Sequence, residues 1–272
     1  TMAGEVVEAG GARLAVKRWG AGQPVVCLHA IGHGADDFEP FAERVGPGFE
    51  VIALDWPGQG DSSLDGGPVT AAHYADLLEA ALPKLCKGPA ILVGNSIGGA
   101  AAITLAARRP DAVKALVICN SGGLAPVGPV ERRAIALLTA FFRAGERGAG
   151  WFKPAFTAYY WMVLPRAPQR RREIVASAYE IAPLLAEAWA SFATPEADLR
   201  GLAEKITAPT LFAWAKGDQI IPWAKSRAAA ERFPHHKVRF FRGGHAAFLE
   251  DADAFAAAFR EGVQTLEASM AA

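Results

Sequence analysis

The feature of this sequence that most limits its fold is a series of short, almost wholly apolar runs that alternate with helical patterns. The runs occur at residues 24–30, 49–56, 89–96, 112–120, 208–218 and 237–244, and the helical patterns at 36–45, 70–86, 97–109, 222–232 and 247–267. Strands that are apolar on both faces are typical of a parallel sheet that helices cover on both sides. Residues 5–19 differ, because Gly10 and Gly11 separate two alternating segments that predict an antiparallel hairpin. The sequence therefore predicts an α/β fold with a mostly parallel central sheet and helices on both faces.

The alternation is interrupted between residues 121 and 205, where clusters of Gly and Pro break several helical patterns. We predict a core formed by residues 1–120 and 206–272, with a helical cap inserted at 121–205. Most aromatic residues of this insertion are expected to pack inside the helical layer, but some could line a substrate pocket. The possible lining residues are Phe141, Phe142, Trp151, Phe156, Tyr159, Tyr160, Trp161 and Trp189, of which we select Phe141, Trp151, Tyr159, Trp161 and Trp189 as substrate-binding candidates.

Composition and charge exclude several classes of protein. The chain has 28 Lys plus Arg and 28 Asp plus Glu, so no net charge attracts it to nucleic acid or to an anionic membrane. Its three cysteines are scattered, and its first twenty residues lack the apolar run of a secretory signal. Residues 88–107 carry no charge, but Gly, Pro, Asn and Ser interrupt them, which favours a buried strand and helix over a membrane span. We expect a cytoplasmic monomer or homo-oligomer that acts on a small molecule and binds neither nucleic acid nor membrane.

A candidate nucleophile lies where one apolar run meets the next helical pattern. Residues 94–98 are Gly-Asn-Ser-Ile-Gly, a GxSxG pattern. A serine exposed on a tight strand-to-helix turn needs small neighbours, and the helix that follows directs free N–H groups toward an oxyanion. The pattern could also arise by chance or mark a phosphate loop, but the chain contains no GK[ST] or GxGxxG motif. Ser96 is therefore the candidate nucleophile.

A serine nucleophile needs a base within hydrogen-bond reach and an acid that orients the base. His245 follows the last predicted strand, after Gly243 and Gly244, which places it on a loop at the carboxyl end of the sheet. Asp218 follows the apolar run at 208–214 in the same way, although an ordinary turn aspartate would occupy a similar position. The order Ser96, Asp218, His245 is the order expected for a nucleophile on such a turn.

An oxyanion hole requires two donors, and the backbone N–H of Ile97, directly after the serine, should be the first. We assign the second to the backbone N–H of Ile31, on the loop that follows the apolar run at 24–28. His29, on the same loop, has a structural role in this interpretation. The sequence contains no metal-binding cluster and no cofactor motif, so we expect neither a metal nor a cofactor.

With these residues assigned, the chain resembles the α/β-hydrolase superfamily along nearly its whole length. Four segments carry the resemblance: HAIGHG (29–34) is similar to the oxyanion loop, DWPGQGDSS (55–63) to the D-x-P-G-x-G-x-S segment, GNSIGG (94–99) to the nucleophile elbow, and GGHAAFLED (243–251) to the histidine segment. Ala30 departs from the glycine that is usual in the oxyanion loop. The resemblance implies the α/β-hydrolase fold with a cap and a Ser-His-Asp triad.

Three functions are considered. The first is a serine hydrolase that cleaves a small to medium, apolar carboxylic ester through an acyl-enzyme. The second is a carbon–carbon bond hydrolase of aromatic ring degradation, because Asn95 before the serine resembles the nucleophile elbow of those enzymes. Two features differ: Ala246 stands where those enzymes usually have a tryptophan, and Arg170 to Arg172 match their cap arginine only loosely. The third is a small-molecule receptor without catalysis, because related folds also serve as binding proteins.

Overall fold

The structure is a computed structural model that describes residues 4–270. Its centre is a sheet of eight strands in the order β1-β2-β4-β3-β5-β6-β7-β8. The strands are β1 (Glu5–Ala9), β2 (Ala12–Gly20), β3 (Gly22–Leu28), β4 (Gly48–Leu54), β5 (Ala90–Asn95), β6 (Val113–Cys119), β7 (Thr210–Ala215) and β8 (His236–Phe241). Strand β2 is antiparallel to its neighbours β1 and β4, and the other pairs of adjacent strands are parallel. The predicted hairpin and mostly parallel sheet are confirmed.

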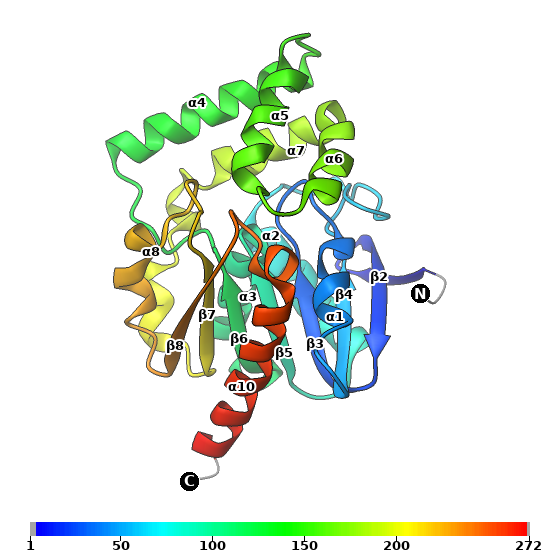
Figure 1. The fold of residues 1–272 in the computed structure, drawn as a ribbon, viewed down its shortest axis with the longest axis vertical. Coiled ribbons are helices and arrows are strands. Elements are labelled where there is room, and N and C mark those ends of the chain that lie inside the picture. Colours follow the sequence, from blue (N-terminus) through cyan, green and yellow to red (C-terminus); the bar gives the residue numbers. More distant parts are fainter. Residues whose placement is uncertain (1–3, 271–272) are drawn as a thin grey trace.

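Helices cover both faces of the sheet (Figure 1), with α10 in front and α3 behind. They are α1 (Glu39–Ala42), α2 (Ala71–Leu85), α3 (Ile97–Arg108), α8 (Trp223–Ala230), α9 (Ala247–Glu250) and α10 (Ala252–Met270). In α2, residues such as Tyr74, Leu77, Leu78 and Leu82 recur every three or four positions and are buried, so one face of the helix packs inward. The Thr70 hydroxyl caps this helix by accepting a hydrogen bond from the His73 N–H. Strands β5 and β7 are buried at every residue, as sheets covered on both faces require.

Two predicted helices differ in detail from the structure. The pattern at 36–45 forms a 3₁₀ turn (Ala35–Phe38) followed by the single turn of α1, so the expected continuous helix is wrong. The closing helix is divided at Asp251, whose backbone is not helical (φ −140°, ψ 48°) and whose carboxylate accepts a hydrogen bond from the Arg242 N–H. The preceding short helix α9 thereby stays beside the loop that carries His245.

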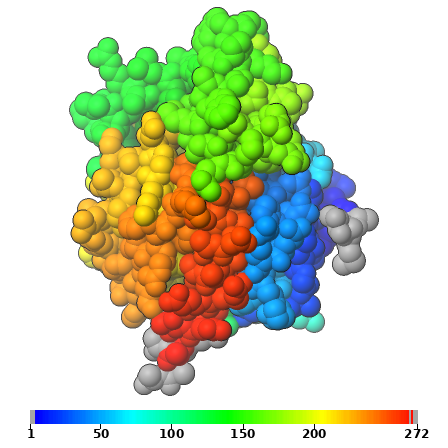
Figure 2. Space-filling view, in the orientation of Figure 1, coloured from blue at the N-terminus to red at the C-terminus, as the bar shows by residue number. Residues whose placement is uncertain are grey.

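Residues 121–205 contain four α-helices and two 3₁₀ turns, and no strand in the structure lies within this range. The helices are α4 (Pro129–Glu146), α5 (Phe152–Val163), α6 (Pro168–Ala176) and α7 (Ala178–Ser191). They lie beyond the carboxyl ends of the parallel strands (Figure 1) and cover the upper end of the molecule in Figure 2. We keep the name cap for residues 121–205. Within residues 4–270, no helix combines the length and the apolar character needed to cross a membrane.

Most aromatic side chains of the cap pack against one another, as expected. Phe142, Phe152, Phe156 and Tyr160 are fully buried, and neighbouring rings lie 4.8 to 6.4 Å apart. Such a cluster gives the cap an apolar interior of its own.

Candidate active site

Ser96 occupies a strained turn between β5 and α3. Its φ of 55° lies in the left-handed region that side chains other than glycine rarely adopt. The flanking glycines are sterically required, because a Cβ at position 94 would lie 2.6 Å from the Gly98 carbonyl oxygen and one at position 98 only 2.4 Å from the Leu28 carbonyl oxygen. The turn presses α3 against the end of β3, and the predicted nucleophile elbow has the expected geometry.

His245 and Asp218 are joined at the carboxyl end of the sheet. The imidazole Nδ1 lies 2.8 Å from the carboxylate Oδ2 of Asp218, and both side chains are buried. The other carboxylate oxygen accepts hydrogen bonds from the backbone N–H groups of Ile220 at 2.8 Å and Ile221 at 2.9 Å. The acid is therefore fixed on both sides, and it holds the proton of His245 on Nδ1.

The negative charge of Asp218 and the positive charge of a protonated His245 stabilise each other. Burial by itself disfavours the ionised form of both groups. The attraction and hydrogen bond between them outweigh burial, so the pKa of Asp218 lies below its ordinary value and the pKa of His245 lies above it. Asp218 is thus a carboxylate at neutral pH, and it stabilises a protonated His245.

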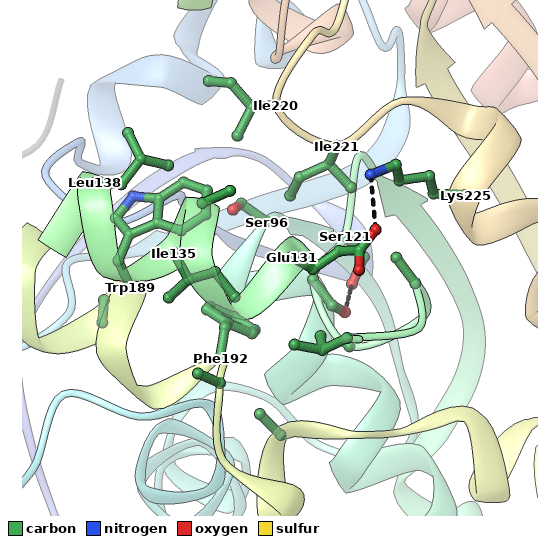
Figure 3. A pocket seen from close by; sticks show the side chains of 18 of the residues that line it. Ser96, Ser121, Glu131, Ile135, Leu138, Trp189, Phe192, Ile220, Ile221 and Lys225 are labelled. Atoms are coloured by element: carbon green, nitrogen blue, oxygen red, sulfur yellow. Dashed lines mark hydrogen bonds and ion pairs between the residues drawn. The ribbon is translucent and has the colours of Figure 1, made fainter. Parts of the chain in front are cut away.

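Ser96 and His245 line the same cavity, which Figure 3 shows from close by, with Ser96 facing the open space. Among the described residues, no hydrogen bond joins the Ser96 hydroxyl to the imidazole. Catalytic hydrogen bonds are often long before substrate binds, so the shared cavity is the informative observation. Three side chains distant in the sequence therefore gather at one end of the sheet.

Two asparagines that the sequence analysis did not assign to the site connect these residues. The Asn95 side chain donates hydrogen bonds to the backbone carbonyls of Cys119 and His245, both at 2.9 Å. The Asn120 side chain donates to Asp218 Oδ2 at 2.8 Å and accepts from the Ala215 N–H at 2.9 Å. The signal in the sequence was the position of each asparagine at the end of an apolar strand, where a buried amide must find partners.

Glu250 was also missed, and it organises the histidine loop. One oxygen of its buried carboxylate accepts hydrogen bonds from the N–H groups of Gly244, His245 and Ala246 at 2.8 to 3.3 Å. The other oxygen accepts from the N–H of Arg166 in the cap at 3.0 Å. The backbone of the histidine loop is therefore held both to the core and to the cap.

Of the two residues chosen for the oxyanion hole, Ile97 directly follows the serine and Ile31 lines the same cavity. Ile97 is the first residue of α3, so its N–H has no carbonyl partner within the helix. Ile31 lies on the wall of the cavity, and the next N–H on that loop, from Gly32, is taken by the Gln59 side chain. His29 is buried and its Nε2 accepts a hydrogen bond from the Trp56 N–H, which agrees with a structural role. Ala30 does not adopt a positive φ, so glycine is not required there.

The cavity has a volume of about 610 Å³ and lies between the cap and the core. Of the five substrate-binding candidates, Tyr159 and Trp189 line it. Phe141, Trp151 and Trp161 do not, so these three predictions are wrong. Phe141 packs within the aromatic cluster of the cap, and Trp151 and Trp161 are largely exposed, the latter with the Arg171 guanidinium 3.5 Å above its ring.

The walls of the cavity are mainly apolar near the serine and charged at one end. Figure 3 shows Leu138 and Trp189 on one side of Ser96, and the ion pair between Glu131 and Lys225 on the other. The atoms of this ion pair are 3.2 Å apart, and both side chains are partly exposed. Within the described part of the chain, no group of three or more His, Cys, Asp or Glu side chains could hold a metal ion.

Comparison with known proteins finds matches to a family model, to curated proteins and to solved structures. The model of a family described as alpha/beta hydrolase fold matches residues 23–252. The chain is 27% identical over 262 residues to a 2-hydroxy-6-oxo-6-phenylhexa-2,4-dienoate hydrolase of Burkholderia cepacia, covering 87% of this chain and 86% of that protein. It is 29% identical over 260 residues to a pimeloyl-[acyl-carrier protein] methyl ester esterase of Xanthomonas campestris, covering 91% and 97%. A thermophilic esterase from Thermogutta terrifontis has a similar fold, with a TM-score of 0.81, 22% identity, and coverage of 97% of this chain and 99% of that one.

Proposed function

Because the chain belongs to the alpha/beta hydrolase fold family, we propose that it is a serine hydrolase that cleaves a carboxylic ester of a small to medium, mainly apolar acid. The observation that carries the proposal is the pairing of His245 with Asp218 at 2.8 Å beside a cavity that Ser96 also lines. A hydroxyl at a positive-φ turn, a paired imidazole and two backbone N–H groups for the oxyanion are the parts that acyl transfer requires.

In the proposed mechanism, Ser96 Oγ attacks the ester carbonyl carbon while His245 Nε2 takes the hydroxyl proton. The carbonyl oxygen becomes an oxyanion that accepts hydrogen bonds from the N–H groups of Ile31 and Ile97. Collapse of this intermediate breaks the bond to the alcohol, which leaves with the proton from His245. Water then repeats the sequence on the acyl-enzyme and releases the acid and Ser96.

Labelling and turnover together test the proposal. A fluorophosphonate should label the protein once, at Ser96, and p-nitrophenyl esters should be hydrolysed. Ser96→Ala should abolish labelling and lower kcat by about 10⁴ or more. Ser121→Ala is the matched control, because Ser121 also lines the cavity, and this variant should still be labelled. Tight binding of small apolar molecules without labelling would instead identify a receptor.

Carbon–carbon bond hydrolysis is the second candidate, favoured by the name of the Burkholderia cepacia relative and by Asn95. Arg170 and Arg171, two of the three loose counterparts of the cap arginine in those enzymes, argue against it. Arg170 is bound to Asp37 and Glu173, and Arg171 donates to the Leu164 carbonyl, and neither lines the cavity. Decay of a coloured ring-fission product without turnover of simple esters would favour this candidate over the ester hydrolase.

A further inference from the structure

A second histidine and aspartate pair borders the cavity, and the proposed mechanism does not use it. His33 Nδ1 lies 2.6 Å from Asp37 Oδ2, and His33 Nε2 lies 3.0 Å from the hydroxyl of Tyr160. All three residues are almost fully buried, and His33 and Tyr160 line the cavity together with Ser96. His33 thus lies in the wall of a cavity whose lining also includes Ile31, Leu138, Val163 and Leu185.

The proton positions of this pair follow from Asp37. Burial opposes ionisation of the carboxyl, but His33 and Arg170 outweigh it and lower the pKa of Asp37 to about 2. The carboxylate accepts hydrogen bonds from His33 Nδ1 and, at 2.6 Å, from Arg170 Nε. A neutral His33 ring therefore has its proton on Nδ1, and its Nε2 is an acceptor.

When the His33 ring is neutral, Tyr160 is the donor in the hydrogen bond between its hydroxyl and His33 Nε2. Burial raises the pKa of Tyr160 well above its ordinary value, so the hydroxyl stays protonated, and the O–H donates to His33 Nε2. Tyr160 lines the cavity, and its oxygen keeps the capacity to accept one further hydrogen bond. Tyr159, whose ring centroid is 5.7 Å from that of Tyr160, also lines the cavity, and its hydroxyl has no hydrogen-bond partner among the described residues.

The charges around this pair leave no excess of positive charge. Arg170 is in direct contact with Asp37 and also pairs with Glu173. A substrate carboxylate would therefore find no net positive charge here, whereas a hydroxyl could donate to the Tyr160 oxygen without an electrostatic penalty.

We propose that Tyr160, oriented by His33, is a binding subsite for a hydroxyl group of the substrate, and that the preferred substrates are esters of hydroxylated apolar acids. The proposal rests on the serine hydrolase function proposed above and specifies its substrate class. The structural alternative is that these residues only attach the cap to the core, since Tyr160 and Arg170 belong to the cap while His33 and Asp37 follow β3.

The experiment uses p-nitrophenyl octanoates that carry a substituent at carbon 6 or at carbon 7. For each of these two positions it compares four esters: the unsubstituted ester and those with a hydroxyl, a methoxy or a keto group. The readout is the ratio of kcat/KM for the substituted and plain esters, in which general effects on catalysis cancel. At its best position the hydroxyl ester should be preferred about tenfold or more, and the methyl ether and ketone should not be, because they cannot donate to Tyr160. Tyr160→Phe should reduce the preference to within about twofold.

Two further variants separate recognition from attachment of the cap. Tyr179→Phe removes the hydroxyl of a cap tyrosine that is bonded to the Ala149 carbonyl and lies outside the cavity, and it should keep the full preference. His33→Leu removes the acceptor of the Tyr160 proton, so the freed O–H should now favour the ketone and the ether. A purely structural role would lower all four rates together and leave the ratios unchanged.

Binding in the Ser96→Ala variant keeps this test independent of turnover. Calorimetry with the methyl esters of the same acids should give the same order of affinities, with the hydroxyl ester bound most tightly. If the wild type turns over no ester but this order is found, the hydrolase proposal fails and the subsite stands. Equal affinities, a preference for the ketone in the wild type, or tighter binding of a matching dicarboxylate monoester would overturn the subsite.

Discussion

Replacement of Asp218 by Asn tests most directly how the carboxylate supports the proposed base. The two carboxylate oxygens accept four hydrogen bonds: Oδ2 from His245 and the Asn120 side chain, and Oδ1 from the N–H groups of Ile220 and Ile221. An amide has only one acceptor oxygen, so in either orientation its NH₂ group faces two donors. Asp218→Asn therefore loses two hydrogen bonds to a charged group, whichever way the amide turns.

The magnitude follows from these contacts. Each hydrogen bond to a charged group contributes about 1.5–3 kcal/mol, so the free energy of unfolding should fall by about 3–6 kcal/mol. Loss of the carboxylate also removes the support of the imidazolium and disturbs the tautomer, for which the corresponding change in a serine protease triad costs about 10⁴ in kcat. Because Asp218 raises the pKa of His245, the acid limb of the kcat/KM profile should also move to lower pH.

Initial rates on a p-nitrophenyl ester between pH 5 and 9, with thermal unfolding followed by circular dichroism, measure both effects. Asp111→Asn is the matched control, since Asp111 is exposed and paired only with Arg109, and it should leave rate and profile unchanged. An Asp218→Asn variant that keeps more than a tenth of the wild-type kcat with an unshifted acid limb would refute the assigned role of the carboxylate.

Three other changes probe the supports of the site. Gly98→Ala should destabilise the protein by about 2 kcal/mol or more, because the added Cβ would lie 2.4 Å from the Leu28 carbonyl oxygen. Gly201→Ala is the control: a Cβ added there would meet no neighbouring heavy atom within 4 Å, so this variant should unfold like the wild type in urea. Glu250→Gln should lower the melting temperature and kcat by weakening three backbone hydrogen bonds; equal melting of this variant and of Glu261→Gln, an exposed control, would contradict that role. The raised pKa of His245 contributes stability that should be fully present below the ordinary pKa of 6.5 and be lost as pH rises through the raised pKa. The difference in melting temperature between the wild type and His245→Ala should therefore shrink from pH 6 to pH 9. A constant or growing difference would contradict the direction of the shift.

Much of the arrangement around Ser96 could be predicted from local patterns. Apolar runs and helical periodicity depend on neighbours in the sequence, so the strand order along the chain, the hairpin and the elbow followed from them. Glycines at 94 and 98 are demanded by the turn itself, and Asp218 and His245 follow strand ends that must meet at one edge of a parallel sheet. These features follow from local geometry, so a single sequence is enough to predict them.

The amino-acid sequence alone determined the α/β class, and it predicted the place of the helical insertion and the three side chains of the candidate triad, because each depends on a few consecutive residues. Only the tertiary structure decided that Asn95 and Glu250 bind the backbone at His245 and that Asn120 binds the Asp218 carboxylate. It also decided that Trp151 and Trp161 face solvent instead of the cavity. The reason is that apolar residues within one turn of a helix point in several directions. Which of these side chains is buried depends on contacts with residues more than a hundred positions away, such as the contact of Tyr160 with His33.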